Sequence, residues 1–284
     1  MRQEKIQTRI SNIFLHQNED VTINEVEITQ LKLSVIIPAF NEESRIESTL
    51  ICWRQYLDKS FADLYEVMVI MDNCSDQTVQ LVVNLSSDWK QLVPVISPVR
   101  LGKGGALIEA CKHSRGDTLF FTDADGAVNP AELKKFMAIR KSCDFVTGSR
   151  YFKNSNFSQG LPFRRFFFSR VFNLITKSLF PELKRYTDTQ CGAKALSKKL
   201  VNTVIPDLFI KDFVFDINLI LASLHHGFSI EEISIEYHHS DNESKITKNL
   251  SRISLTMFLS LIKLRIYHSR FRNLTFAERS FNSK

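Results

Sequence analysis

The stretch TLFFTDADG, residues 118–126, places a short apolar run directly before two aspartates. The apolar part predicts a buried β-strand, because short runs of β-branched and aromatic residues are typical of strands inside a sheet. Asp123 and Asp125 follow two residues apart, so both carboxylates point to one side where the backbone stays extended. Carboxylate oxygens are ligands that Mg²⁺ and Mn²⁺ prefer. A capped turn is the alternative interpretation, since Asp and Gly are common turn residues.

Apolar runs alternate with helical patterns on both sides of this stretch. The expected strands are 33–38, 66–71, 92–96, 118–122, 144–147 and 230–237. One helix is expected through Ile46, Leu50 and Trp53, and a second at 76–85 with Asp76 as its N-cap. Further helices are expected at 102–114, 130–141, 164–180, 212–224 and 251–270. This alternation predicts an α/β fold with a mostly parallel central sheet flanked by helices. Ligands bind at the carboxyl ends of such strands, so polar residues following the strands are the candidate site.

A second candidate site lies at the start of the helix 102–114, in the sequence Leu101-Gly102-Lys103-Gly104-Gly105-Ala106. Glycines allow a ligand to approach the backbone closely, and a helix N-terminus attracts anions. The loop therefore favours contact with phosphate, although its spacing is not that of a P-loop. An ordinary loop leading into a helix is the alternative interpretation.

Five motifs, in the order in which they occur along the chain, resemble those of family 2 glycosyltransferases of the GT-A fold. They are Pro38-Ala39-Phe40-Asn41-Glu42-Glu43, Asp72-Asn73-Cys74-Ser75-Asp76, Gly102-Lys103-Gly104-Gly105-Ala106, Asp123-Ala124-Asp125-Gly126 and Gly148-Ser149-Arg150-Tyr151. Later motifs are similar to the subgroup that glycosylates polyprenyl phosphates, such as the dolichyl-phosphate β-glucosyltransferases. They are Asp188-Thr189-Gln190-Cys191-Gly192-Ala193-Lys194, Phe215-Asp216 and Ser244-Lys245-Ile246. The resemblance covers residues 31–247.

The resemblance implies a GT-A nucleotide-diphospho-sugar transferase fold and a role for each matching residue. Asp123 and Asp125 would hold Mg²⁺ or Mn²⁺ on the sugar nucleotide. The implied nucleotide-sugar ligands are Pro38, Asn41, Glu42, Asp72, Gly102, Lys103, Asp123 and Lys245. The implied catalytic and acceptor-side residues are Arg150, Asp188, Gln190 and Asp216. Asp216 would act as a general base or, in the interpretation we favour, would orient cations on the acceptor side.

Positive charge and Phe are concentrated outside the first half of the chain. The 284 residues carry 37 Lys and Arg against 31 Asp and Glu, and include 23 Phe. Residues 151–200 hold ten basic and two acidic residues, and 251–284 hold seven and one. This pattern predicts an anionic or lipid-like partner, with Arg164 and Arg165 binding an acceptor phosphate and 251–272 forming an interfacial helix. A solvated basic surface over a Phe-filled core is the alternative. Nucleic acid is not expected, because no recognised binding module accompanies the charge.

The predicted organisation is an N-terminal arm at 1–31, a glycosyltransferase domain at 32–248 and a basic amphipathic extension at 249–284. The five cysteines are scattered, which favours a reducing compartment. No apolar run is long enough to span a membrane. We therefore expect a cytoplasmic protein, peripheral at the membrane face.

The expected activity is the inverting transfer of a hexose to a polyprenyl phosphate, with glucose from UDP-glucose implied by the resemblance. A phosphate monoester has a second pKa of about 6, so this acceptor needs positioning more than deprotonation. The alternatives are a GDP-mannose donor, a soluble or saccharide acceptor, or a non-catalytic protein that binds sugar nucleotide.

Overall fold

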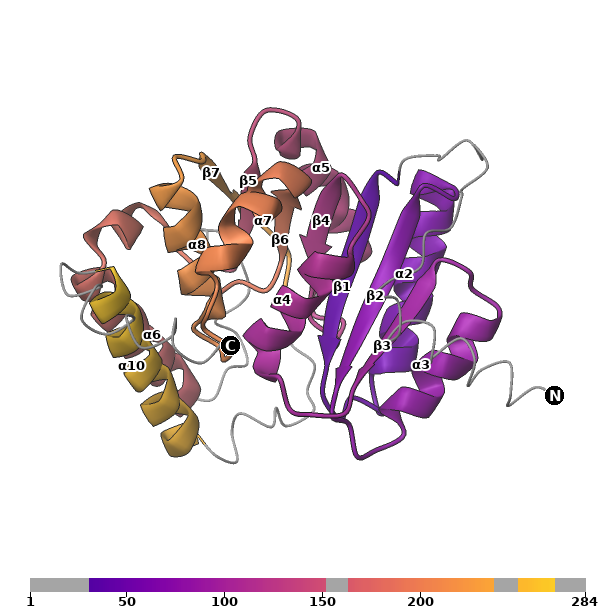
Figure 1. The fold of residues 1–284 in the computed structure, drawn as a ribbon, viewed down its shortest axis with the longest axis horizontal. Coiled ribbons are helices and arrows are strands. Elements are labelled where there is room, and N and C mark those ends of the chain that lie inside the picture. The colour runs from indigo at the N-terminus through magenta and orange to yellow at the C-terminus, as the bar shows by residue number, and fades with distance from the viewer. Residues whose placement is uncertain (1–30, 152–162, 238–249, 269–284) are drawn as a thin grey trace, which may run out of the picture.

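The computed structural model describes residues 31–151, 163–237 and 250–268. They form a seven-stranded sheet with helices packed on both faces (Figure 1). The strands are β1 (Leu33–Ala39), β2 (Tyr65–Asp72), β3 (Leu92–Ser97), β4 (Thr118–Phe121), β5 (Phe145–Ser149), β6 (Lys194–Ser197) and β7 (Ile230–Ser234). The α-helices are α2 (Ile46–Phe61), α3 (Thr78–Ser87), α4 (Gly102–His113), α5 (Leu133–Arg140), α6 (Phe163–Leu179), α7 (Lys198–Val204), α8 (Phe215–His225) and α10 (Leu250–Tyr267).

The strand order is β3-β2-β1-β4-β6-β5-β7, and every neighbouring pair is parallel except the two that involve β6. The predicted α/β fold with a mostly parallel central sheet is thus confirmed. Sequence reasoning missed β6 and α7. Since β6 runs antiparallel between β4 and β5, its first residues lie at the carboxyl ends of those strands. The insertion of β6 therefore brings residues near 190 to the edge where Asp123 lies.

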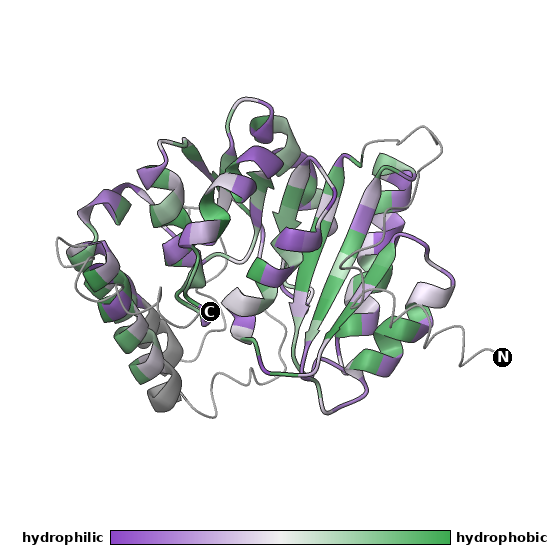
Figure 2. Ribbon diagram, in the orientation of Figure 1, coloured by the Kyte–Doolittle hydropathy of each residue, from purple (hydrophilic) through white to green (hydrophobic). Residues whose placement is uncertain are grey.

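Alternation along β1 divides the core between the two faces of the sheet. Ile36 belongs to the cluster that includes α4 and α8, while Val35 and Ile37 belong to the cluster that includes Trp53 of α2. Figure 2 shows that the central strands are predominantly hydrophobic along their length. Burial on both faces accounts for the continuous apolar runs in the sequence.

Two predicted helix starts differ from the structure. Asp76 is not the N-cap of α3, because Gln77 occupies that position. The Asp76 carboxylate instead accepts the N–H of Thr78 at 3.0 Å and the N–H of Glu43 at 3.1 Å, which links α3 to the end of β1. The helix predicted at 130–141 begins as a 3-10 turn at Pro130–Glu132 and continues as α5.

Helices α6 and α10 cover one end of the molecule (Figure 1). Leu261 and Leu264 of α10 are buried in the same core cluster against which Ile175 and Leu179 of α6 pack. Among the described residues, no helix has the length and apolar character needed to cross a membrane. Residues 1–30 and 269–284, which make up most of the predicted arm and part of the predicted extension, lie outside the described residues.

Candidate active site

Asp123 and Asp125 directly follow β4, as the sequence predicts. The Oδ1 of Asp123 forms an ion pair with the Nζ of Lys103 at 2.7 Å, and the Oδ1 of Asp125 accepts the N–H of Ala127 at 3.0 Å. Burial and the neighbouring Asp123 charge both raise the pKa of Asp125 above its usual value. The two carboxylates are therefore close enough for their charges to interact, and a nearby cation would favour the ionised form of both.

Lys103 supplies part of that positive charge. Burial alone would raise the pKa of Asp123, yet Lys103 lowers it below its usual value, with smaller effects from Arg150 and Lys194. Burial would lower the pKa of Lys103, but Asp123 and Asp216 raise it. Asp123 is thus an ionised carboxylate held by protein cations, with an ammonium group at the position of a counter-ion.

A divalent cation fits these residues. Asp123 and Asp125 would supply oxygen ligands, and the ammonium of Lys103 is already bound to the carboxylate of Asp123. Across the ranges that the structure describes, no group of three or more His, Cys, Asp or Glu residues forms a complete metal site. A shortage of protein ligands is typical of Mg²⁺ and similar ions that bind through one or two carboxylates together with substrate phosphates and water.

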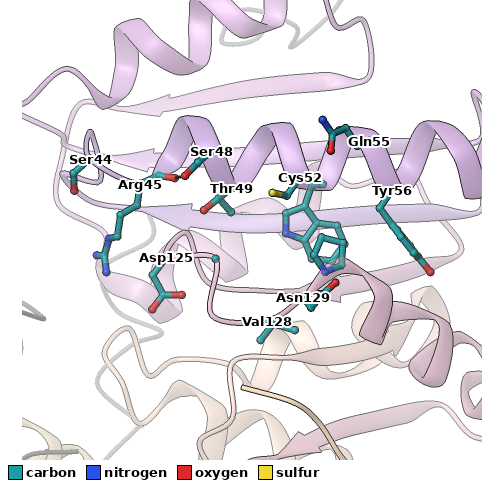
Figure 3. Close-up of a pocket in the computed structure, with 13 residues that line it drawn as sticks. Ser44, Arg45, Ser48, Thr49, Cys52, Gln55, Tyr56, Asp125, Val128 and Asn129 are labelled. Atoms are coloured by element: carbon teal, nitrogen blue, oxygen red, sulfur yellow. Dashed lines mark hydrogen bonds between the residues drawn. The ribbon is translucent and has the colours of Figure 1, made fainter. Parts of the chain in front are cut away.

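A cavity of about 680 Å³ reaches Asp125 from the side of α2 (Figure 3). Hydroxyl and amide groups from α2 and the segment after β4 form much of its wall. The lining residues are Ser44, Arg45, Ser48, Thr49, Cys52, Trp53, Gln55, Tyr56, Asp125, Gly126, Val128, Asn129 and Pro130. Thr49 donates a hydrogen bond to the carbonyl of Ala124 at 3.1 Å, so α2 supports the turn between the two aspartates.

Asp72 has a structural task that sequence reasoning did not predict. Its side chain is 2% exposed, pairs with Arg100, and accepts the N–H groups of Leu101 at 2.5 Å and Gly102 at 2.9 Å. The guanidinium of Arg100 also lies 3.4 Å from the centre of the Phe40 ring. Asp72 therefore shapes the loop before α4, and direct contact between its carboxylate and a nucleotide stays a prediction.

At the glycine-rich start of α4, three backbone N–H groups already have acceptors within the protein. The N–H of Gly102 is bound to Asp72, and those of Gly104 and Gly105 both point to the carbonyl of Lys211, at 2.9 and 3.3 Å. A Cβ on Gly102 would lie 2.4 Å from the same carbonyl oxygen, and its φ is +77°. These glycines permit close approach of the protein's own chain, and binding of a nucleotide by Gly102 stays a prediction.

The other predicted donor-side residues join the ends of β1 and β2. Pro38 lies in β1 opposite Ile70 of β2. Asn41 has a φ of +54° and accepts the N–H of Ser75 at 2.7 Å. Glu42 donates its N–H to Thr78 at 2.7 Å and accepts a hydrogen bond from Arg45 Nε at 2.9 Å. The structure thus groups these residues at one sheet edge, and their contact with a nucleotide sugar is untested. The set brought together here is Pro38, Asn41, Glu42, Asp72, Gly102, Lys103, Asp123 and Asp125.

Arg150 and Asp188 form the acceptor side of the predicted site. Arg150 donates from Nε to Asp188 at 2.7 Å and from an Nη atom at 3.0 Å, a bidentate pair that is largely buried. Burial alone would raise the pKa of Asp188, but Arg150 lowers it. The backbone N–H of Gln190 also donates to Asp188 at 3.1 Å, and its side-chain amide donates to the carbonyl of Phe213 at 3.2 Å. The pair therefore fixes the turn that contains Gln190.

Aromatic rings lie near the guanidinium groups of Arg150 and Arg170. The guanidinium of Arg150 lies 5.7 Å from the ring centres of both Tyr151 and Tyr237, and that of Arg170 lies 5.9 Å from Tyr151. Burial raises the pKa of Tyr237 above its usual value, as do the charges of Asp125 and Asp123. Tyr237 forms an isolated bridge with Val128, three residues after Asp125, and the rings and cations continue from there to Arg170 of α6.

Asp216 is ion-paired inside the protein. Its Oδ1 lies 2.8 Å from the Nζ of Lys194, and both side chains are buried, at 5% and 0% exposed. Proton abstraction from an acceptor would require this carboxylate to be accessible. The orienting role favoured for Asp216 and the catalytic role of Arg150 both stay predictions.

The side chains of three predicted binding residues lie outside the part of the structure that is described. Lys245 lies outside the described residues. Arg164 and Arg165 belong to the first turn of α6, where the helix is described but the side chains are not.

Sequence reasoning missed Lys194 and Tyr237 as members of the site. A signal for Lys194 was present, because a lysine within the short apolar run 193–196 indicates a buried charge that needs a partner. Nothing local indicated Tyr237, because its proximity to the aspartates arises from an isolated bridge with Val128.

The family follows from a comparison with known sequence families. Residues 34–203, well over half of the chain, match the family described as "Glycosyl transferase family 2". The chain belongs to glycosyltransferase family 2. The resemblance found in the sequence is thus confirmed, and the protein is a glycosyltransferase.

Similar proteins refine this placement. A dolichyl-phosphate beta-glucosyltransferase of Trichomonas vaginalis is 27% identical over 249 residues, covering 83% of this chain and 73% of the relative. The dolichyl-phosphate beta-glucosyltransferase of Saccharomyces cerevisiae is 26% identical over 285 residues, covering 92% and 80%. The fold resembles glucosyl-3-phosphoglycerate synthase of Mycobacterium tuberculosis, solved with Mn²⁺, UDP-glucose and phosphoglyceric acid. That match has a TM-score of 0.65 and 20% identity, and it covers 88% of this chain and 86% of the other.

Proposed function

We propose that this glycosyltransferase transfers glucose from UDP-glucose to a polyprenyl phosphate such as dolichyl phosphate, with inversion, at the cytoplasmic face of a membrane. The observation that carries the proposal is the pair of carboxylates after β4, of which Asp123 is ion-paired with Lys103 at 2.7 Å and has its pKa lowered further by the charge of Arg150. The names of the relatives support glucose and dolichyl phosphate, and the neighbouring structure with UDP-glucose supports the donor nucleotide.

Asp123, Asp125 and Lys103 form the donor side. In this proposal the two carboxylates hold Mg²⁺ or Mn²⁺, which when bound neutralises the diphosphate and the charge that develops on it. The ammonium of Lys103, 2.7 Å from Asp123, adds a positive charge that stabilises the leaving diphosphate. Both effects act on charge that grows as the sugar departs, so they lower the barrier more than they strengthen substrate binding.

The reaction is a single displacement. An oxygen of the acceptor phosphate attacks the anomeric carbon, and the new carbon–oxygen bond forms as the bond to the diphosphate breaks. UDP leaves with the bonding electron pair, and attack from the opposite face inverts the configuration. No base is needed, because a phosphate monoester with a second pKa of about 6 is already ionised near neutral pH.

Arg150 is the proposed contact for the acceptor phosphate. Its guanidinium is held in one orientation by Asp188, and it and the guanidinium of Arg170 of α6 lie 5.7 and 5.9 Å from the centre of the Tyr151 ring. A planar guanidinium suits phosphate oxygens. The row of cations and rings therefore offers a path from the aspartates to the helix where the sequence also has Arg164 and Arg165.

Helices α6 and α10 are the proposed membrane-facing surface. Leu174 of α6 is 68% exposed, and Leu255 and Leu259 of α10 are 60% and 59% exposed. Neither helix contains Asp or Glu, while both contain Lys and Arg. Exposed apolar side chains among basic ones are typical of helices that lie on an anionic lipid surface. A lipid-linked acceptor would reach Arg150 from that side.

The test is a transfer assay with purified protein and labelled UDP-glucose in Mn²⁺. One set of reactions receives polyprenyl phosphate, a second receives neutral sugars, and a third replaces the donor with labelled GDP-mannose. We expect label in the lipid fraction only with UDP-glucose and polyprenyl phosphate. Label that enters only a soluble product, or transfer only from GDP-mannose, would overturn the acceptor or the donor assignment. UDP binding without transfer to any acceptor would indicate a non-catalytic protein.

A further inference from the structure

Lys194 is a fully buried lysine that the proposed reaction does not use. Its side chain is 0% exposed, and it lies at the first position of β6, opposite Phe121 of β4 and Thr147 of β5. A buried ammonium is costly unless it is paired and hydrogen-bonded. A residue that destabilises the fold in this way usually has a second task, and its neighbours indicate which one.

Two groups satisfy the ammonium of Lys194. It forms the 2.8 Å ion pair with Asp216 in the first turn of α8, and it donates a short hydrogen bond to the carbonyl oxygen of Cys191. The Asp216 contact balances charge. The Cys191 contact has a geometric effect, because it fixes the orientation of a main-chain carbonyl in the turn that leads into β6.

That carbonyl belongs to the peptide that joins Cys191 to Gly192. The peptide unit is planar, so holding its oxygen also fixes the direction in which Gly192 leaves it. Gly192 lies against Asp123: a Cβ added there would be 2.2 Å from Asp123 Oδ2 and 2.8 Å from its Cγ. The turn therefore forms one wall of the space in which the Asp123 carboxylate lies.

We propose that Lys194 is a positioning residue, which keeps Gly192 against Asp123 by holding the Cys191–Gly192 peptide and so orients the carboxylate for a divalent cation. This inference rests on the metal role of Asp123 in the proposed function. It assigns to Lys194 an action through the main chain, in addition to its ion pair with Asp216.

A purely structural ion pair makes a different prediction. If Lys194 only neutralised Asp216, replacing both residues by uncharged ones would restore stability and leave Asp123 undisturbed, as in other buried pairs. If Lys194 holds the peptide, the double replacement restores stability but leaves Gly192 unrestrained. Comparison of Lys194→Met/Asp216→Asn with Asp216→Asn alone isolates the contact to Cys191, because only the single variant keeps it.

The experiment measures amide hydrogen exchange across residues 188–193 and the affinity for Mn²⁺ in the presence of UDP, by titration. We expect faster exchange in this segment for the double variant than for Asp216→Asn. We also expect Mn²⁺ affinity about tenfold weaker, the loss typical when a residue that orients a metal ligand is removed. The melting temperature of the double variant should be at least that of Lys194→Met, because it leaves no unpaired buried charge.

Lys198→Met is the matched control. Lys198 follows β6 directly, beyond the strand end opposite to Lys194, and donates from Nζ to the hydroxyl of Ser114 at 3.0 Å and to the carbonyl of Cys111 at 3.4 Å. Its loss should lower the melting temperature without changing exchange at 188–193 or the affinity for Mn²⁺.

Equal exchange and equal Mn²⁺ affinity in the double variant and Asp216→Asn would overturn the positioning role while leaving the proposed function intact. Wild-type protein without any Mn²⁺ affinity in the presence of UDP would overturn the proposed donor chemistry and, with it, the orientation of Asp123 for a metal. The exchange data would then still decide whether Lys194 holds the turn.

Discussion

In the proposed function, residues 33–149 form the donor half of the molecule and residues 163–267 form the acceptor half, with Arg150 joined to the acceptor half through Asp188. The two halves are built on different principles. In the donor half, polar side chains at the strand ends are already bound to other protein groups. Asp72 is held by three donors near α4, and Asn41 is bound to Ser75. In the acceptor half, α6 and α10 carry only basic charges and expose apolar side chains such as Leu174 and Leu255.

This difference reflects the two kinds of substrate in the proposed reaction. A small charged donor is recognised by a few groups whose positions are set in advance, since preorganised charges cost no reorganisation when the substrate reacts. A lipid-linked acceptor is recognised by apolar area and by the sign of the surface charge. The halves meet at β6, where Lys194 lies between the strands that lead to Asp123 and Arg150.

Asp125→Ala tests the donor half most severely. Removing one of the two carboxylates should reduce kcat/KM for transfer by roughly 10³-fold. The reason is that the divalent cation proposed to stabilise the leaving diphosphate would no longer be held. Steady-state kinetics at saturating Mn²⁺ provide the measurement, with the exposed Glu47→Gln on α2 as a control that keeps wild-type rates. Undiminished transfer by Asp125→Ala would remove the metal role from this half.

Arg150→Lys tests the junction of the halves. Lysine keeps the charge but cannot make the bidentate contact with Asp188, so we expect the acceptor KM to rise about tenfold while the donor KM stays within twofold. The free energy of unfolding should also fall, by about 1–2 kcal/mol for the lost hydrogen bond. A change in donor KM as large as that in acceptor KM would contradict the division between the halves.

The parts of the site that could be predicted from sequence depend on neighbours along the chain. The strand 118–122 and the two aspartates after it are local, so their pattern predicts both the strand and the position of the aspartates at its carboxyl end. The parallel order of β1, β2 and β4 follows from the alternation of strands and helices. Motif order then supplied the family, because the motifs follow the strands that bring them together.

The contacts that could not be predicted join residues far apart in sequence. Asp72 accepts hydrogen bonds from main-chain N–H groups about 30 residues later in the chain. The carbonyl of Lys211 accepts hydrogen bonds from the N–H groups of Gly104 and Gly105 in α4, which are more than 100 residues away. Both contacts are made by groups that sequence reasoning assigned to a ligand. The short strand β6, with only four residues and a buried lysine, gives too weak a periodic signal to be identified.

Phe258→Glu gives the smallest expected effect and tests the acceptor half alone. Phe258 of α10 and Ile51 of α2 are both 41% exposed, so Ile51→Glu is a matched control on a helix of the donor half. Partial burial of one aromatic ring in lipid contributes about 1 kcal/mol, so binding of Phe258→Glu to anionic phosphatidylserine vesicles should weaken about fivefold. Ile51→Glu should bind them like the wild type, and both variants should bind UDP unchanged. Equal losses for both variants would show that vesicle binding depends on overall charge, and the apolar surface of α10 would then have no special part in it.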